Sequence, residues 1–158
     1  KTIKQEIDGL DCTLIFAPGR VIVGNAGILV PRVRYTTQSP AKKIIIVDAG
    51  MNDLIRPPLY QAFHFIWPAN VPEKFVPSSR HKNLKLKDAE VVDVVGPICE
   101  SGDFFAKDRA IPPAKRGDLL AIFSAGAYGF TMSSNYNARC RAAAPGRSAA
   151  TGRTATTS

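Results

Sequence analysis

A thiol and a carboxylate stand side by side in the segment GPICESGD at residues 96–103, where Cys99 and Glu100 follow the apolar run at 91–95. Glycine and proline frame this turn. A loop at the end of a strand can hold two reactive side chains in fixed directions while its glycines let a ligand approach the backbone. The arrangement is typical of an active site, although a Cys-Glu pair taken alone is more often a small buried side chain beside a solvated acid.

Three further segments set polar residues and glycines between apolar runs in the same way: APGR at 17–20, DAGMNDLIRPPLY at 48–60 and AGAYGF at 125–130. In the second of these, Arg56 and Tyr60 are four residues apart. A helical turn would place both on one face, where a guanidinium fork and a phenol could bind the same carboxylate. The alternative is a surface arginine and a packed tyrosine, which the pair by itself favours.

Together and in this order, the four segments resemble the diaminopimelate decarboxylases. These are pyridoxal-phosphate enzymes of the ornithine, diaminopimelate and arginine decarboxylase family, and they make L-lysine and CO2 from meso-diaminopimelate. The resemblance runs from about residue 14 to about residue 137 and includes the stretches VDAGMNDLIRPPLY, VVGPICESGDFFAKDR and GDLLAIFSAGAYGF. It implies a lyase of lysine biosynthesis with pyridoxal 5'-phosphate as its cofactor.

The resemblance implies residues that hold the cofactor. Gly19 and Arg20 match a Glu-Pro-Gly-Arg turn that meets the phosphate and the substrate at the C-terminal face of a barrel. Ala17 stands here where the family has the glutamate, so one polar contact of that turn is in doubt. Tyr128 matches a tyrosine that contacts both the cofactor phosphate and the substrate. The glycines on either side of it have no side chains that would crowd the backbone there.

The resemblance also implies a substrate site. Arg56 and Tyr60 match a substrate-binding pair, and Cys99 matches the proposed proton donor to the α-carbon, a role that needs a thiol which is readily reprotonated. Glu100 matches an acid that binds the distal ammonium. A glutamate, where ornithine decarboxylases have an aspartate, favours diaminopimelate over ornithine or arginine. In the family this Cys-Glu loop serves the partner subunit's site, which implies a homodimer.

The family's catalytic lysine lies in an N-terminal (β/α) barrel that this chain does not contain. We therefore expect a barrel remnant at 1–27, a C-terminal β domain at 28–137 and a disordered basic tail at 138–158, and we expect the chain alone to be inactive. The chain also opens without Met, which fits a start in the middle of a gene.

The tail departs abruptly from the family's ending. Its composition buries too little apolar surface to order itself, and a reading-frame shift would produce it.

The element pattern predicts a mainly β fold, a mixed sheet or partial β-barrel with short helices, because the connections are too varied for regular βαβ units. A short helix is expected within 53–63, since two prolines are tolerated only near its first turn. Residues 20–27 are ambiguous between helix and loop. Pro31 would push its strand to an edge or a bulge. The expected strands are 13–16, the last strand of the barrel remnant, and 28–35, 43–47, 63–67, 91–95 and 119–123.

Composition is that of one soluble domain, with 158 residues and 45% apolar content. No stretch has the length of a membrane span and no signal peptide is visible. Three cysteines without paired spacing favour a reducing compartment, and so the cytoplasm. His64 and His81 are far apart and no metal-ligand spacing occurs; His64 is expected to be a half-buried strand residue. The tail at 138–158 has four arginines and no acidic residue, so it supplies half of the net charge of +8. Because the rest of the chain is then only moderately basic, a nucleic-acid role is less favoured.

Two alternatives stay open. The first is a sister decarboxylase that acts on ornithine, arginine or carboxynorspermidine. The second is a non-catalytic module that uses the same β surface for dimerisation or regulation of an intact subunit. A nucleic-acid role driven by the basic tail comes last.

Overall fold

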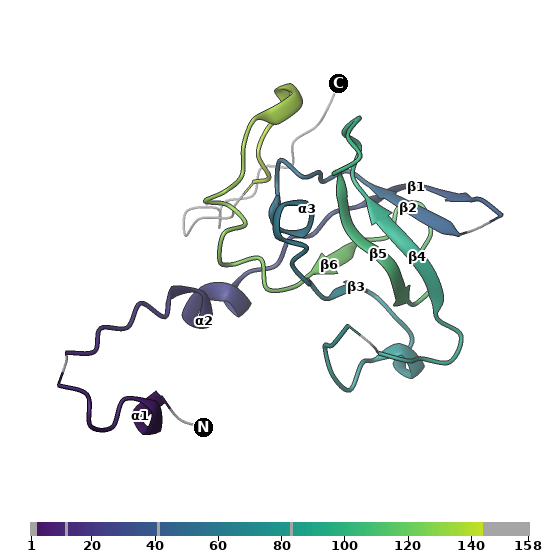
Figure 1. The fold of residues 1–158 in the computed structure, drawn as a ribbon. Helices are drawn as coiled ribbons and strands as arrows, with labels where there is room; N and C mark the ends of the chain where they lie inside the picture. Colours follow the sequence, from purple (N-terminus) through teal and green to yellow (C-terminus); the bar gives the residue numbers. More distant parts are fainter. Residues whose placement is uncertain (1–2, 12, 41, 83, 144–158) are drawn as a thin grey trace, which may run out of the picture.

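The computed structural model describes residues 3–11, 13–40, 42–82 and 84–143. Two small sheets form the body of the domain, with short helices around them (Figure 1). The strands are β1 Val33–Gln38, β2 Lys43–Val47, β3 Ile66–Pro68, β4 Glu90–Val95, β5 Phe104–Ile111 and β6 Leu120–Ile122. The α-helices are α1 Ile3–Glu6, α2 Gly19–Val23 and α3 Arg56–Tyr60, and three 3-10 helices span η1 Gly24–Ala26, η2 Glu73–Phe75 and η3 Tyr136–Ala138.

The larger sheet has the order β1-β2-β4-β5 and is mixed. β2 pairs antiparallel with β1 and parallel with β4, and β4 pairs antiparallel with β5. The β-branched run at 43–47 forms β2 in the interior of this sheet, as its composition predicts. β1 is an edge strand with a register shift between Val33 and Tyr35, close to the position where Pro31 predicted an edge or bulge.

The smaller sheet pairs β3 with β6 antiparallel, and the stretch before β1 joins it to the larger sheet. Leu29 and Ile122 exchange two backbone hydrogen bonds of 3.0 and 2.8 Å, and Val33 donates to the carbonyl of Asp118 at 2.8 Å. Side chains from both sheets meet in one core, whose fully buried members include Val33, Ile45, Val47, Leu54, Ile66, Val92, Val94, Phe105, Ile111, Leu120 and Ile122. The predicted mixed, mainly β architecture is confirmed.

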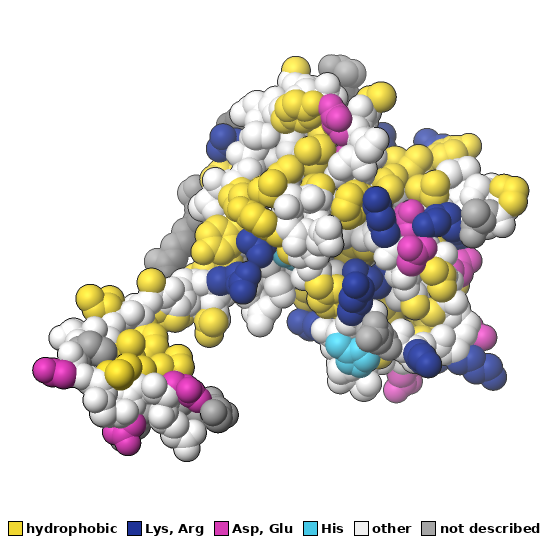
Figure 2. Space-filling view, in the orientation of Figure 1, with side chains coloured by type: hydrophobic (Ala, Val, Ile, Leu, Met, Phe, Trp, Pro, Cys, Tyr) yellow, Lys and Arg dark blue, Asp and Glu magenta, His cyan; other side chains and the backbone are white. Residues whose placement is uncertain are grey.

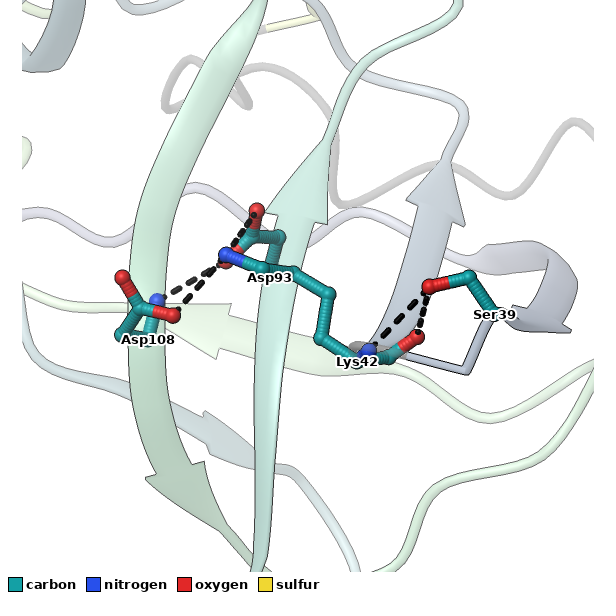
Figure 3. A network of polar contacts seen from close by, with 4 residues as sticks. All are labelled: Ser39, Lys42, Asp93 and Asp108. Atoms are coloured by element: carbon teal, nitrogen blue, oxygen red, sulfur yellow. Dashed lines mark hydrogen bonds and ion pairs between the residues drawn. The ribbon is translucent and has the colours of Figure 1, made fainter.

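β5 is a strand that the sequence pattern did not predict. Its register against β4 shifts twice between Val92 and Val95, and Asp108 adopts a left-handed φ of 49°. The irregularity is stabilised by Asp93, which accepts the Asp108 amide at 2.8 Å and the Lys42 ammonium at 3.1 Å, while Lys42 also pairs with Asp108 at 2.9 Å (Figure 3). Charged residues inside the strand break the alternation that would have identified it.

The expected strand at 13–16 is wrong, because these residues form no strand. Leu14, Ile15 and Phe16 are 42%, 87% and 57% exposed, and this part of the chain reaches away from the two sheets (Figure 1). A barrel strand is held by hydrogen bonds to neighbours on both sides, and the described residues supply no neighbour for this segment. The ambiguous stretch that follows is helical, as α2 and then η1.

Residues 138–143, within the segment expected to be disordered, contact the domain. Arg139 Nη2 donates to the carbonyl of Asp48 at 2.5 Å, and the amide of Ala142 donates to Asp53 Oδ1 at 2.9 Å. Arg139 and Ala142 therefore hold this stretch against the loop that precedes α3. The rest of the expected tail, 144–158, lies outside the described residues. Among those that are described, no helix is long and apolar enough to cross a membrane.

Candidate functional site

Helix α3 positions two of the predicted site residues. It begins at Arg56, tolerates Pro57 and Pro58 in its first turn, and ends at Tyr60; Gln61 follows as the C-cap with a left-handed φ of 52°. The spacing of four places Arg56 and Tyr60 on the same face, with the guanidinium carbon of Arg56 5.5 Å from the centre of the Tyr60 ring. This contact is a cation–π interaction.

Tyr128 reaches the same guanidinium from the turn after β6. Its ring centre lies 5.2 Å from the guanidinium carbon of Arg56, and its φ of 63° is left-handed. Two glycines permit this tight turn: a Cβ on Gly129 would overlap the carbonyl of Ala125, and a Cβ on Gly126 would lie 2.7 Å from the amide nitrogen of Gly27. A tyrosine in this backbone conformation costs of order 1–3 kcal/mol and persists only where the surroundings impose it.

A pocket of about 830 Å³ opens beside this pair, between α2 and α3. Figure 2 shows Lys and Arg side chains gathered where the N-terminal segment meets the domain, which is where α2 and α3 lie in Figure 1. None of the residues lining the pocket is acidic. Its polar lining residues are Arg20, Asn25, Arg56, Tyr60, His64 and Ser124. Two guanidiniums with hydroxyls and an amide suit an anionic ligand such as a phosphate or a carboxylate.

Gly19 stands next to Arg20 at the start of α2 but does not line this pocket. A Cβ added at Gly19 would meet nothing within 4 Å. The described part of the chain therefore gives no steric reason for a glycine at this position. The structure brings together Arg20, Arg56, Tyr60 and Tyr128 of the predicted site residues.

His64 is a pocket residue that the sequence pattern did not single out. It is 3% exposed and lies just before β3, rather than half-buried within a strand. Its Nδ1 lies 2.9 Å from the carbonyl of Phe123, which can only accept, so the proton sits on Nδ1; Nε2 is buried with no partner in the described structure. Burial lowers the pKa of His64, and the charges of Arg56 and Arg109 lower it further.

Arg109 supports His64 from β5. It is 8% exposed, donates from Nη1 to the carbonyl of His64 at 3.0 Å and lies over the Phe63 ring at 4.4 Å. Burial lowers the pKa of Arg109. This contact could not be predicted, because the strand that carries Arg109 was itself not predicted from the sequence.

Cys99 and Glu100 lie outside this pocket. Both are exposed in the turn between β4 and β5, and neither lines the pocket that holds Arg20 and Arg56. Glu100 Oε1 accepts a hydrogen bond from the phenol of Tyr136, and this bond raises the pKa of Tyr136. Within one chain, the structure therefore separates the predicted proton donor from the predicted phosphate and carboxylate ligands.

A family model described as "Pyridoxal-dependent decarboxylase, C-terminal sheet domain" matches residues 12–126. The chain belongs to this family. The pyridoxal group in the description agrees with the cofactor that the resemblance implied. The description as a sheet domain agrees with the mainly β fold.

Relatives of this decarboxylase domain carry a more specific name. The chain is 49% identical over 141 residues to a diaminopimelate decarboxylase of Aquifex aeolicus, covering 89% of this chain and 30% of the relative. It is 51% identical over 143 residues to that of Pseudomonas aeruginosa, covering 90% and 31%. A crystal structure of diaminopimelate decarboxylase from Helicobacter pylori complexed with L-lysine is similar with a TM-score of 0.69 and 42% identity, covering 88% of this chain and 31% of that one. The chain thus spans about 30% of the length of these relatives.

Proposed function

We propose that this chain forms the C-terminal sheet domain of a diaminopimelate decarboxylase, an enzyme that converts meso-diaminopimelate to L-lysine and CO2. The observation that carries the proposal is the Arg56 guanidinium in contact with the Tyr60 and Tyr128 rings beside Arg20, in a cationic pocket without an acidic lining residue. Identities of 49% and 51% to proteins of this name support the choice of substrate.

The pocket fits part of a pyridoxal phosphate. Its guanidiniums and hydroxyls are donors of the kind a phosphate requires, and Arg20 would hold that group together with Tyr128, whose ring contacts Arg56 at the pocket. Pyridoxal phosphate, when bound, supplies a ring that accepts the electrons released as the α-carboxylate leaves as CO2. None of the residues lining the pocket is a lysine, so this domain contributes binding groups around the cofactor.

Arg56 and Tyr60 would bind the distal carboxylate of the substrate. The guanidinium of Arg56 makes no hydrogen bond or ion pair to another described residue and lies against two aromatic rings. The rings orient the planar guanidinium while its N–H groups stay available, which is the arrangement for a two-point contact with a carboxylate. Tyr60 is 59% exposed and can add its hydroxyl to the same group.

Cys99 and Glu100 would act at a neighbouring site. In this proposal the Cys99 thiol returns a proton to the α-carbon, and the Glu100 carboxylate binds the distal ammonium. Both side chains are exposed and lie outside the pocket of their own chain. That separation supports a homodimer in which the turn at 96–103 completes the partner subunit's pocket.

A chimaera tests the proposal. Residues 14–137 would replace the matching segment of the Aquifex aeolicus relative, and CO2 release would be measured with meso-diaminopimelate and with ornithine at equal concentrations. We expect cofactor-dependent release from meso-diaminopimelate and much slower release from ornithine. A folded, cofactor-binding chimaera that is inactive on meso-diaminopimelate, or that prefers ornithine, would overturn the assignment. The 158-residue chain alone is expected to release no CO2.

A further inference from the structure

Asp103 is a buried carboxylate that joins two loops far apart in the sequence. It is 3% exposed, immediately before β5. Its Oδ2 accepts the amide of Ile98 at 2.6 Å, and its Oδ1 accepts the amide of Met51 at 2.6 Å. Both distances are short, as in charge-assisted hydrogen bonds. Each carboxylate oxygen therefore holds a different loop.

The two loops carry different parts of the candidate site. The Ile98 amide belongs to the turn that presents Cys99 and Glu100, and the Met51 amide belongs to the loop that leads into α3 with Arg56. Asp53 closes this second loop, because its Oδ2 accepts the amide of Gly50 at 3.0 Å. Asp103 thus connects the predicted proton donor to the base of the helix that presents the predicted carboxylate ligand.

The surrounding residues are shaped around this carboxylate. A Cβ on Gly96 would approach the Cγ of Asp103 to 2.7 Å, so a side chain at 96 would displace the carboxylate. Gly50 in turn leaves room for Ile98, whose Cδ1 a Cβ there would approach to 2.9 Å. The turn is closed further by the Gly96 amide, which donates to the carbonyl of Asp103 at 3.0 Å, and by the Asp103 amide, which donates to that of Glu100 at 3.0 Å.

A carboxylate is an expensive group to bury, and an apolar residue would fill the space at lower cost if packing were its only purpose. Burial raises the pKa of Asp103, while the bonds from Ile98 and Met51 act in the opposite direction. What the carboxylate provides, and an apolar side chain cannot, is a fixed acceptor for two amides at once.

We propose that Asp103 is a positioning residue that holds the Cys99–Glu100 turn in a fixed place relative to the loop that leads into α3. The function of that turn rests on the proposed decarboxylase activity, but the connection itself does not. Ile98 is anchored by its amide and by its buried side chain, whereas the next two residues are exposed. Cys99 and Glu100 are therefore exposed residues that directly follow an anchored residue, Ile98.

The test uses amide NMR of the 158-residue chain with Asp103→Asn. An asparagine fills the same space but replaces one carboxylate oxygen with an NH2 donor, so the amides of Ile98 and Met51 no longer each have an acceptor oxygen. We expect the amide protons of Ile98 and Met51 to move upfield and to exchange about tenfold faster or more, and the heteronuclear Overhauser effects of Cys99 and Glu100 to fall. Exchange at Ile45 in β2 is expected to stay within about twofold of the wild-type rate.

Asp118→Asn is the matched control. Asp118 Oδ2 accepts the amide of Lys115 at 2.9 Å in a turn on another loop. This variant should loosen residues 115–117 and leave the Cys99–Glu100 turn unchanged. If Asp103→Asn leaves the turn as ordered as in the wild type, or accelerates exchange at Ile45 as much as at Ile98, Asp103 serves only overall stability and the inference fails.

A measurement on the wild-type chain covers the case in which Asp103→Asn does not fold. The amide shifts of Ile98 and Met51 should titrate with pH at one common midpoint, because one carboxylate binds both. Asp53 and Arg139 are the charged groups that act on Asp103; Arg139 can only donate, and the two amides donate to Asp103 rather than to Asp53. Two different midpoints would overturn the inference. None of these readouts needs decarboxylase activity, so an inactive chimaera with a rigid turn would reject only the proposed function.

Discussion

The guanidinium carbon of Arg56 lies 5.2 Å from the centre of the Tyr128 ring, which brings together two residues that are 72 positions apart in the sequence. Arg56 presents a flat cation from α3, and Tyr128 supplies the aromatic face from a strained turn after β6. The contact orients the arginine without occupying its N–H donors.

Arg56→Lys keeps the charge but loses the planar fork and most of the stacking. In the chimaera we expect kcat/KM for meso-diaminopimelate to fall about 10- to 100-fold, or roughly 1.4–2.7 kcal/mol, mainly through a higher KM. Arg34→Lys, on the exposed side of β1, is the control and should change neither constant. An unchanged KM in Arg56→Lys would show that Arg56 does not bind the substrate.

Gly126→Ala should destabilise the 158-residue chain. The added Cβ would overlap the carbonyl of Val23 and lie 2.7 Å from the amide nitrogen of Gly27, so the backbone around η1 must move. We expect a loss of about 1–3 kcal/mol in the free energy of unfolding, measured by urea denaturation. Gly19→Ala has open space around its Cβ and should be neutral or slightly stabilising. Equal effects of the two substitutions would contradict the close approach at Gly126.

His64 should make the domain sensitive to acid. Its pKa in the folded state is lowered below the ordinary 6.5, chiefly by burial. The stability it contributes is therefore present above about pH 6.5 and is lost as the pH falls through the folded pKa, by at most about 1.4 kcal/mol per pH unit. The measurement is the free energy of unfolding against pH.

His64→Gln should flatten this dependence because it removes the titrating group. His81→Gln, on an exposed loop residue, should keep the wild-type slope. The comparison between variant and wild type separates the effect of His64 from that of Asp103. The raised pKa of Asp103 makes the free energy of unfolding increase as the pH falls, in the acidic range below that of His64. If the free energy of unfolding changes with pH equally in the wild type and both variants, His64 is not the source of the acid sensitivity.

Tyr136 should ionise at higher pH than an ordinary tyrosine. Its phenol donates to the Glu100 carboxylate, which favours the protonated phenol and raises its pKa above 10.0. Near-ultraviolet absorbance of the chain should show one of its four tyrosines titrating late. Glu100→Gln should lower that midpoint, and Glu90→Gln, whose partner is Lys43, should leave it in place. A midpoint that is indifferent to Glu100 would mean that the hydrogen bond does not form in solution.

Local sequence patterns predicted three of the described strands closely, whereas the strands expected at 28–35 and 63–67 form later in the chain, as β1 at Val33–Gln38 and β3 at Ile66–Pro68. The β-branched run at 43–47 became β2 without a change of boundary, and the runs at 91–95 and 119–123 became β4 and β6 with ends displaced by about one residue. β5 was missed because its charged residues interrupt the alternation of apolar and polar residues that identifies a strand. The prediction of a strand at 13–16 was wrong because a strand needs hydrogen-bonded neighbouring strands, and the sequence of the segment itself does not show whether they are present.

The identities and order of the residues by themselves determined the family, the mainly β class and the spacing that puts Arg56 and Tyr60 on one helical face, since these depend on short segments and on local geometry. Only the tertiary structure decided that Tyr128 contacts Arg56, that His64 is buried beside their pocket, and that Asp103 reaches Met51. Each of these depends on a polar or aromatic group finding a partner from a distant segment, and local sequence does not specify which distant segment will be there.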